Sequence, residues 1–181
     1  MVKSKLFYGI LVLVVVIVTI FIWNSSSQSS GDVVGSELAG EWIDFELRDV
    51  KTGQTFKVSD FDRPVLLESF AVWCPTCTRQ QREIRELHDE VGDSIISISL
   101  DTDPNEDEER VRQHIESNGF DWYYAVAPVE FTQSLIDQFG VSIVNAPSAP
   151  VVLICDDQKV RKLGSGVKSA SQLKQEVERG C

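Results

Sequence analysis

The feature that most constrains the fold is an apolar strand that leads directly into a pair of cysteines. The run VLLESFAV (residues 65–72) is typical of a short buried strand, and WCPTC (residues 73–77) follows it at once. Helical spacing of apolar residues then continues to about residue 90. Cys74 is therefore expected at a helix N-terminus, where unpaired N–H groups and the helix dipole favour a thiolate. Cys77 lies one turn further, close enough to form a disulfide with it.

A C-x-x-C pair can also be half of a zinc site. Structural zinc takes four ligands, and the remaining candidates show no matching second spacing: Cys155, Cys181, His88 and His114. Both histidines fall on expected helices and carry no signal of their own. A redox dithiol is therefore favoured over zinc, and no metal is expected.

Charge excludes one class of function and raises one alternative. The chain has 17 basic and 28 acidic residues, a formal net charge of -11, so a nucleic-acid binder with a basic face is disfavoured. Acidic side chains alternate from Asp101 to Glu109 as in a calcium-binding EF-hand loop. Glu106 stands where that loop needs glycine and Arg112 where it needs glutamate, so a negatively charged helix N-terminus explains the run better.

The N-terminal residues predict a membrane anchor. Residues 6–23 are 18 uncharged, mostly apolar residues, preceded by Lys3 and Lys5, and no small-residue cleavage site follows. An uncleaved anchor over residues 1–23 is expected, with the N-terminus in the cytoplasm and the rest outside the cell membrane. Residues 24–40 are rich in Ser and Gly and form the expected linker to a domain at 41–181.

Strand and helix signals alternate along that domain, which predicts an α/β fold. The expected strands are an N-terminal hairpin within 44–61, then 65–72, 94–100, 122–127 and a closing hairpin of 151–155 with 159–166. The expected helices are 75–90, a helix capped by Asp103 that runs to 117, then 130–140 and 169–180.

The stretch VLLESFAVWCPTC resembles the active-site strand and turn of thioredoxin-fold proteins. The anchor, the hairpin before this strand and the additional helix and strand at 104–127 resemble the membrane-anchored TlpA, ResA and DsbE branch. The resemblance implies a central mixed sheet flanked by helices, with an N-terminal β-hairpin and a central helix–strand insertion, preceded by one transmembrane helix. Proteins of this branch usually carry a proline early in the active-site helix, and TRQQREI lacks it.

The resemblance also implies a cis-proline that faces the cysteines. Pro147 and Pro150 are both candidates, and Pro150 is preferred because the apolar strand follows it directly. A cis bond here would expose the backbone of Ala149 for pairing with a substrate chain. The expected substrate contacts are Trp73, Pro75, Thr76, Ala149 and Pro150.

Glu68 interrupts the apolar strand six residues before Cys74. Members of this family often hold an acidic group beneath the active-site disulfide. A buried carboxyl tends to have a raised pKa and can accept the proton of Cys77 when that thiol attacks a mixed disulfide. The alternative is a glutamate on an edge strand that points to water.

These residues predict a membrane-tethered thiol–disulfide oxidoreductase. Cys74 would attack a substrate disulfide and Cys77, helped by Glu68, would resolve the mixed disulfide, with no dissociable cofactor. No cation lies between the cysteines, which favours a protein-disulfide reductase over a DsbA-like oxidase. The resemblance implies a CcdA- or DsbD-like membrane electron donor. A peroxiredoxin would need Thr where Ala71 stands, and a Sco-type copper protein would need a C-x-x-x-C pair.

Two further cysteines remain. In a thioredoxin fold Cys155, at the end of a strand, and Cys181, at the end of the last helix, both lie at the pole opposite Cys74. Two thiols left near each other in an oxidising compartment tend to pair, so a structural disulfide between them is one of two interpretations. The alternative is a buried Cys155 that packs as a small hydrophobe beside a frayed C-terminus.

Overall fold

The structure, a computed structural model, describes residues 37–181. The expected membrane anchor (1–23) and residues 24–36 of the expected linker (24–40) lie outside these residues. Within 37–181, no helix is both long and apolar enough to cross a membrane. The description that follows concerns this part of the chain alone.

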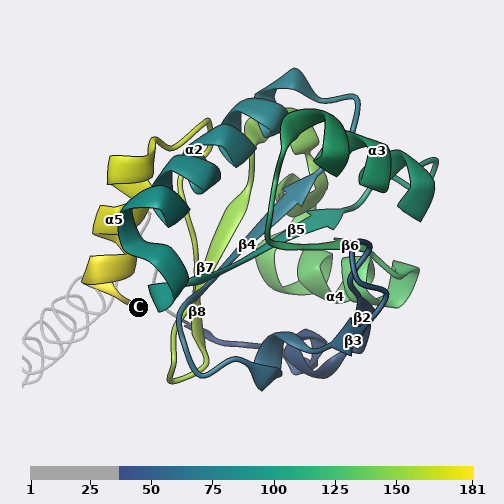
Figure 1. Cartoon of the computed structure of the whole chain (residues 1–181). Helices are drawn as coiled ribbons and strands as arrows, with labels where there is room; N and C mark the ends of the chain where they lie inside the picture. The colour runs from purple at the N-terminus through teal and green to yellow at the C-terminus, as the bar shows by residue number, and fades with distance from the viewer. Residues whose placement is uncertain (1–36) are drawn as a thin grey trace, which may run out of the picture. The chain divides into compact units, whose positions relative to one another are not determined.

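Six strands form a mixed sheet in the order β1-β8-β7-β4-β5-β6 (Figure 1). Parallel pairing joins β4 to β5 and β5 to β6, and antiparallel pairing joins β4 to β7, β7 to β8 and β8 to β1. The strands are β1 (Glu37–Leu38), β4 (Val65–Phe70), β5 (Ile96–Asp101), β6 (Tyr123–Val126), β7 (Val151–Ile154) and β8 (Lys159–Lys162). This is the mixed central sheet that the sequence predicts.

Helices cover both faces of the sheet (Figure 1). One face carries α2 (Pro75–Val91), α3 (Glu108–Asn118) and α5 (Ala170–Arg179), and the other carries α4 (Val129–Phe139). Single 3-10 turns connect several elements, at Glu41–Asp44, Val58–Asp60, Gly92–Ser94, Val141–Val144 and Ala146–Ser148 (η5). The central insertion is present as α3 and β6.

The side-chain alternation of β4 decides what faces the active-site helix. Leu66 and Phe70 belong to the core beneath α2, whereas Val65 and Leu67 belong to the core on the α4 side. Because successive side chains of a strand point to opposite faces, Glu68 lies on the α2 face. On the neighbouring strand β5 the polar residues of ISISLD alternate in the same way. The α2 face of the sheet therefore carries a buried polar strip: Glu68, Ser97, Ser99 and Asp101.

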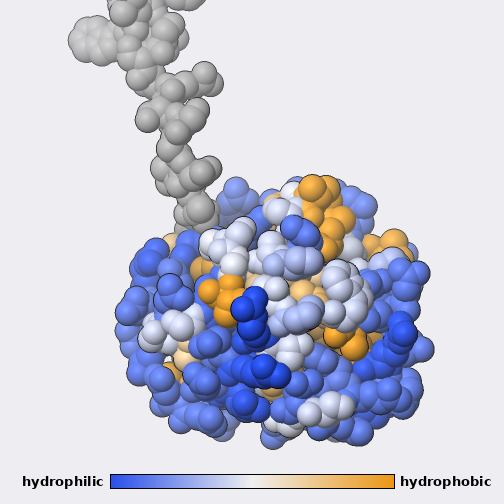
Figure 2. Space-filling model, turned by 90° about the horizontal axis from the view of Figure 1, so that it is seen from above, coloured by the Kyte–Doolittle hydropathy of each residue, from blue (hydrophilic) through white to orange (hydrophobic). Residues whose placement is uncertain are grey.

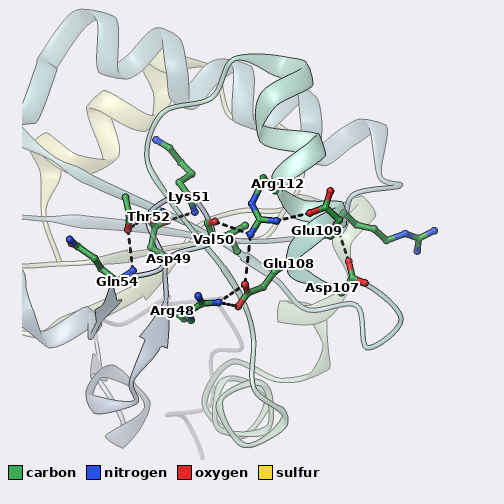
Figure 3. A network of polar contacts seen from close by, with 11 residues as sticks. Arg48, Asp49, Val50, Lys51, Thr52, Gln54, Asp107, Glu108, Glu109 and Arg112 are labelled. Carbon is green, nitrogen blue, oxygen red and sulfur yellow. Dashed lines mark hydrogen bonds and ion pairs between the residues drawn. The ribbon is translucent and has the colours of Figure 1, made fainter.

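The N-terminal hairpin forms a separate two-stranded sheet, β2 (Leu47–Arg48) and β3 (Thr55–Phe56), as predicted. Its turn docks on β6, where the Val50 N–H donates to the Tyr124 carbonyl at 2.7 Å. Arg48 also reaches the start of α3 and binds both carboxylate oxygens of Glu108 at 2.6–2.8 Å (Figure 3). The hairpin is thus joined to the insertion helix as well as to the sheet.

One predicted helix start is wrong. Asp103 was expected to cap the insertion helix, but the N-cap of α3 is Asp107, whose side chain accepts from the Arg110 N–H at 2.9 Å. The Glu106 N–H bonds to the Asp103 carbonyl and closes a turn over Pro104 instead of a helix. The Asp103 carboxylate is occupied by the Asn105 N–H and by the Trp73 indole. Capping preference alone could not show that Trp73 competes for this side chain.

A second disulfide joins Cys155 and Cys181, one of the two alternatives that the sequence left open, with their Cα atoms 6.0 Å apart. It ties the end of the chain, after α5, to the turn between β7 and β8. The C-terminus lies at the far end of α2 from its first turn, which carries Cys74 (Figure 1). This disulfide therefore stabilises the pole of the domain opposite the dithiol.

Candidate active site

The two cysteines of the motif form a disulfide at the start of α2, with their Cα atoms 5.3 Å apart. Cys74 is the N-cap of α2, and its Sγ accepts a hydrogen bond from the Cys77 N–H at 3.2 Å. Pro75 occupies the first helical position, where its missing N–H costs nothing. A negative charge on Cys74 after reduction would face free N–H groups of the helix, which lowers the pKa of a thiol there.

The disulfide is almost wholly enclosed. Cys74 is 1% exposed and Cys77 is 0% exposed, whereas the neighbouring Trp73 is 57% exposed. Pro75 is also exposed and Thr76 is half-buried, so three of the expected substrate contacts are reachable from solvent. A hollow of about 380 Å³ lies beside Trp73 and is lined by Ala71, Thr102–Pro104 and Val144–Pro147.

The loop opposite the cysteines differs from the prediction. No peptide bond within residues 37–181 is cis, so Pro150 is trans. Ala149 and Pro150 are buried, and their carbonyl oxygens already accept hydrogen bonds from Lys168 Nζ and the Ser69 N–H. Ala149 has φ 45°, and this left-handed residue after η5 turns the chain inward before β7.

The expectation of a cis Pro150 is therefore wrong, whereas the expected substrate contacts of Ala149 and Pro150 stay a prediction. Ala146 and Pro147 lie beside the dithiol: the Ala146 carbonyl is 3.1 Å from Cys77 Sγ, and both residues line the hollow beside Trp73. The sequence favours Pro150 over Pro147 because an apolar strand follows it directly. In the structure this position at the start of β7 buries Pro150 instead of leaving it at the surface.

Glu68 is buried on the face of the sheet that α2 covers, and its side chain is 0% exposed. Its Oε2 accepts from Ser99 Oγ at 2.9 Å, and its Oε1 has no hydrogen-bond partner. Burial raises the pKa of Glu68 to about 8, while the hydrogen bond from Ser99, the nearby Gln81 amide and the charge of Lys168 oppose that rise. The structure thus excludes the alternative of a glutamate that points to water.

Several neighbours of Glu68 were missed from the sequence. Gln80 and Gln81 follow Cys77 by three and four residues, so they share its buried helix face, and this spacing was an available signal. His114 joins this cluster, because its Nε2 lies 2.6 Å from Gln81 Oε1. Lys168, from the loop before α5, gave no local signal because only the tertiary fold brings it here. His88 likewise pairs with Ser97 at 2.9 Å.

Carboxylates from the loop after β5 hold the turn that carries the cysteines. Glu106 Oε2 accepts from the Val72 N–H, and Asp103 Oδ2 accepts from Trp73 Nε1, each at 2.6 Å. Asp101 lies below them, and burial raises its pKa to about 7, helped by the negative charge of Glu106. The acidic run that resembles a calcium loop therefore fixes the active-site turn.

A thioredoxin-like sheet with a C-x-x-C disulfide at the helix N-terminus after β4 defines a thiol–disulfide oxidoreductase of the thioredoxin-like superfamily. The chain matches the Redoxin family over residues 39–177, and it belongs to that family. It is 24% identical over 160 residues to the thioredoxin-like protein YneN of Bacillus subtilis, a match that covers 86% of this chain and 88% of YneN.

Solved structures share the fold. A secreted Mycobacterium tuberculosis disulfide oxidoreductase homologous to E. coli DsbE matches with a TM-score of 0.58 and 14% identity, over 78% of this chain and 99% of that one. The thioredoxin domain of a Bacteroides vulgatus thiol–disulfide oxidoreductase matches with a TM-score of 0.59 and 16% identity, over 83% and 99%.

Proposed function

We propose that this protein is a protein-disulfide reductase that works outside the cytoplasm, tethered to the membrane by residues 1–23. The observation that carries the proposal is the buried Glu68 carboxyl on the α2 face of the sheet, under the helix that bears Cys77. A group there with a pKa of about 8 can take up and release a proton near neutral pH.

The reaction follows from this arrangement. The Cys74 thiolate attacks one sulfur of a substrate disulfide and releases the other as a thiolate, which leaves a mixed disulfide. The Glu68 carboxylate then takes the proton of Cys77, and the Cys77 thiolate attacks Cys74 Sγ. The Cys74–Cys77 bond forms, the bond to the substrate breaks, and two electrons have passed to the substrate.

The charges around the turn support a reductase. A thiolate stabilised by nearby cations makes the reduced form favourable and the protein an oxidant. Here Pro75 and Thr76 carry no charge, and the side chains that bind the turn are the acidic Asp103 and Glu106. Negative charge beside Cys74 disfavours its thiolate, so the dithiol gives up electrons more readily.

Location and electron supply rest on the sequence and on similarity. The apolar run at 6–23 with its preceding lysines supports an extracytoplasmic domain, and a structural neighbour is described as secreted. A reductase there needs electrons from across the membrane, and a CcdA- or DsbD-like donor fits that requirement. The substrates would be protein disulfides.

Trapping tests the reaction. Cys77→Ser should accumulate mixed disulfides between Cys74 and partner proteins in membranes, because the resolving thiol is gone. The matched control, Cys74→Ser with Cys77→Ser, should accumulate none. Mixed disulfides that are equally abundant in both variants would contradict the proposal.

The reduction potential of the Cys74–Cys77 couple tests the direction. A reductase should lie near thioredoxin, at about −270 mV, and a DsbA-like oxidase near about −120 mV. Equilibration with glutathione or dithiothreitol buffers, read by Trp73 fluorescence next to the disulfide, gives the value. A potential near the second figure would establish the oxidase instead.

A further inference from the structure

A second hollow lies beside the one at Trp73, and the reaction above makes no use of it. It has a volume of about 330 Å³ and lies between the loop after β5, the end of β6 and α4. Half of its lining residues are apolar, namely Pro104, Val126, Ala127, Val129 and Ile136. Pockets that bind ligands begin at about 300 Å³, so the second hollow has room for a large apolar side chain.

The two hollows meet at the loop after β5, because residues Thr102–Pro104 line both of them. The first hollow also includes Ala146, whose carbonyl lies 3.1 Å from Cys77 Sγ. A polypeptide whose disulfide reaches the dithiol can therefore continue past Trp73 into the second hollow. The second hollow is thus an extension of the candidate active site rather than a separate depression.

Exposed apolar side chains border this path. Four large hydrophobic side chains are exposed within residues 37–181, and two of them line the hollows. Trp73 is 57% exposed and lines the first hollow, and Val129, the first residue of α4, is 76% exposed and lines the second. Apolar side chains gathered along one depression are typical of a surface that binds a partner.

The charge of the linings indicates what kind of partner fits. Asp103 and Glu106 carry negative charge, and no lysine, arginine or histidine is among the described residues that line either hollow. The hydrogen bond from the Trp73 indole lowers the pKa of Asp103, so this carboxylate is ionised at neutral pH. The complementary occupant carries positive charge. A second copy of this chain, with a net charge of -11, and an anionic lipid surface are both disfavoured.

We propose that the second hollow is a substrate subsite, which binds a large apolar side chain from an extended substrate segment that also carries a lysine or arginine. This inference rests on the proposed function. The segment flanks the substrate cysteine that meets Cys74. Val129 and Ile136 contact its apolar side chain, and Asp103 and Glu106 attract its cation. The substrates selected in this way are unfolded or partly folded proteins, because a folded protein buries most of its large apolar side chains.

Peptide disulfides test the subsite. Each peptide is a serine–glycine chain with one lysine and one cysteine, and the cysteine is capped by 2-mercaptoethanol. A single leucine is placed in turn at each position up to about six residues on either side of the cysteine, a reach of about 20 Å in an extended chain. The reduced full-length protein is mixed with each peptide, and second-order rate constants are measured by Trp73 fluorescence. Each is divided by the rate constant for 2-hydroxyethyl disulfide, which is too small to reach beyond the dithiol.

Leucine at a favourable position should raise this ratio about tenfold over the leucine-free peptide, because burying a leucine side chain supports a factor of that size or more. The absence of an acceleration at every position would overturn the inference and leave the proposed function intact. A reduced protein that no disulfide oxidises would contradict the proposed function itself, and the inference with it.

Two substitutions change the chemistry and the space of the second hollow separately. Val129→Ser removes an apolar wall, and Ala127→Leu fills the hollow. Each should reduce the leucine acceleration at least about threefold. Val141→Ser is the matched control, because Val141 is 75% exposed and lines neither hollow, and it should keep the full acceleration. An acceleration that survives in Val129→Ser would overturn the inference, and this exposed position can be tested even where Ala127→Leu fails to fold.

The charge of the occupant is tested with the wild-type protein. Replacing lysine by glutamate in the fastest peptide should slow the reaction at least about threefold at low ionic strength, and the difference should vanish in about 1 M salt, where charges are screened beyond about 3 Å. Equal rates at low salt would overturn the proposed substrate class. Sedimentation of the full chain tests the other occupant: a dimer that Val129→Ser abolishes, without any leucine acceleration, would assign the hollow to a second copy.

Discussion

Glu68 reduces the stability of the fold that it serves. Burial raises its pKa from an ordinary value of 4.5 to about 8. Between these values the folded protein retains a proton that the unfolded chain has released, so stability falls as pH rises through this range and stays low above it. A side chain that costs stability in this way is typical of a functional position.

Glu68→Gln should therefore stabilise the oxidised protein more at pH 9 than at pH 5. Glutamine keeps the shape and the acceptor for Ser99 Oγ but never carries charge. We expect a gain of about 1–4 kcal/mol at pH 9 and little change at pH 5, measured by urea unfolding. Glu86→Gln, exposed on α2, is the control. An equal effect at both pH values would contradict the raised pKa of Glu68.

The loop after β5 holds the active-site turn in place through hydrogen bonds. Glu106 and Asp103 hold the Val72 amide and the Trp73 indole, and this leaves Trp73 half-exposed beside the hollow. Hydrogen bonds to a carboxylate are stronger than neutral ones, at about 1.5–3 kcal/mol each. The turn therefore owes its fixed geometry to a neighbouring loop as well as to its own sequence.

Glu106→Ala should free the Val72 amide. We expect hydrogen exchange at Val72 to become about 10- to 100-fold faster, since the bond to Oε2 is lost. Glu106→Gln retains an acceptor oxygen and should keep most of the protection. Exchange measured by NMR on the oxidised protein distinguishes the variants, and unchanged protection in Glu106→Ala would show that the Val72 bond contributes nothing.

The Cys155–Cys181 disulfide should stabilise the domain through α5. It closes a loop with a sequence separation of 26, for which the chain-entropy relation gives about 3–4 kcal/mol. The double substitution Cys155→Ala with Cys181→Ala should lower the free energy of unfolding by roughly that amount. The variant should keep its Cys74–Cys77 exchange activity, because the two disulfides lie at opposite poles. A variant as stable as the wild type would show that the bridge is dispensable.

The sequence predicts those elements whose signals are local. Alternation predicts the hairpin, and the apolar run followed by the C-x-x-C turn predicts β4 and α2. Glu68 is predicted as a site residue because an acid interrupts an apolar strand. Predictions failed where distant residues compete. Asp103 caps no helix because Trp73 uses its carboxylate. Pro150 is trans and buried, with the Ala149 carbonyl bonded to Lys168 and its own carbonyl bonded to the Ser69 N–H. Lys168 itself reaches the site only through the packing of α5 on α2.

Two cores, one on each face of the sheet, make up the interior of the described domain. The segment before β4, residues 37–64, contributes buried side chains to the core on the α4 side. Trp42 is 1% exposed and packs edge-on against Phe131, with their ring centroids 5.9 Å apart. Its indole N–H donates to Gln138 Oε1 at 2.5 Å. Outside the cores the surface is mainly hydrophilic, with hydrophobic side chains in separate patches on the face shown in Figure 2.

A domain that starts at residue 37 should fold by itself, whereas one that starts at residue 63 should not. The shorter chain loses Trp42, Leu47 and Phe56, and α4 would expose the apolar face that they cover. Trp42→Ala tests the same contact without a deletion and should cost about 3–5 kcal/mol, because a buried tryptophan leaves a large cavity. Circular dichroism and urea unfolding of the three proteins measure this. A stable, cooperatively folded 63–181 fragment would show that the hairpin region is an accessory rather than part of the core.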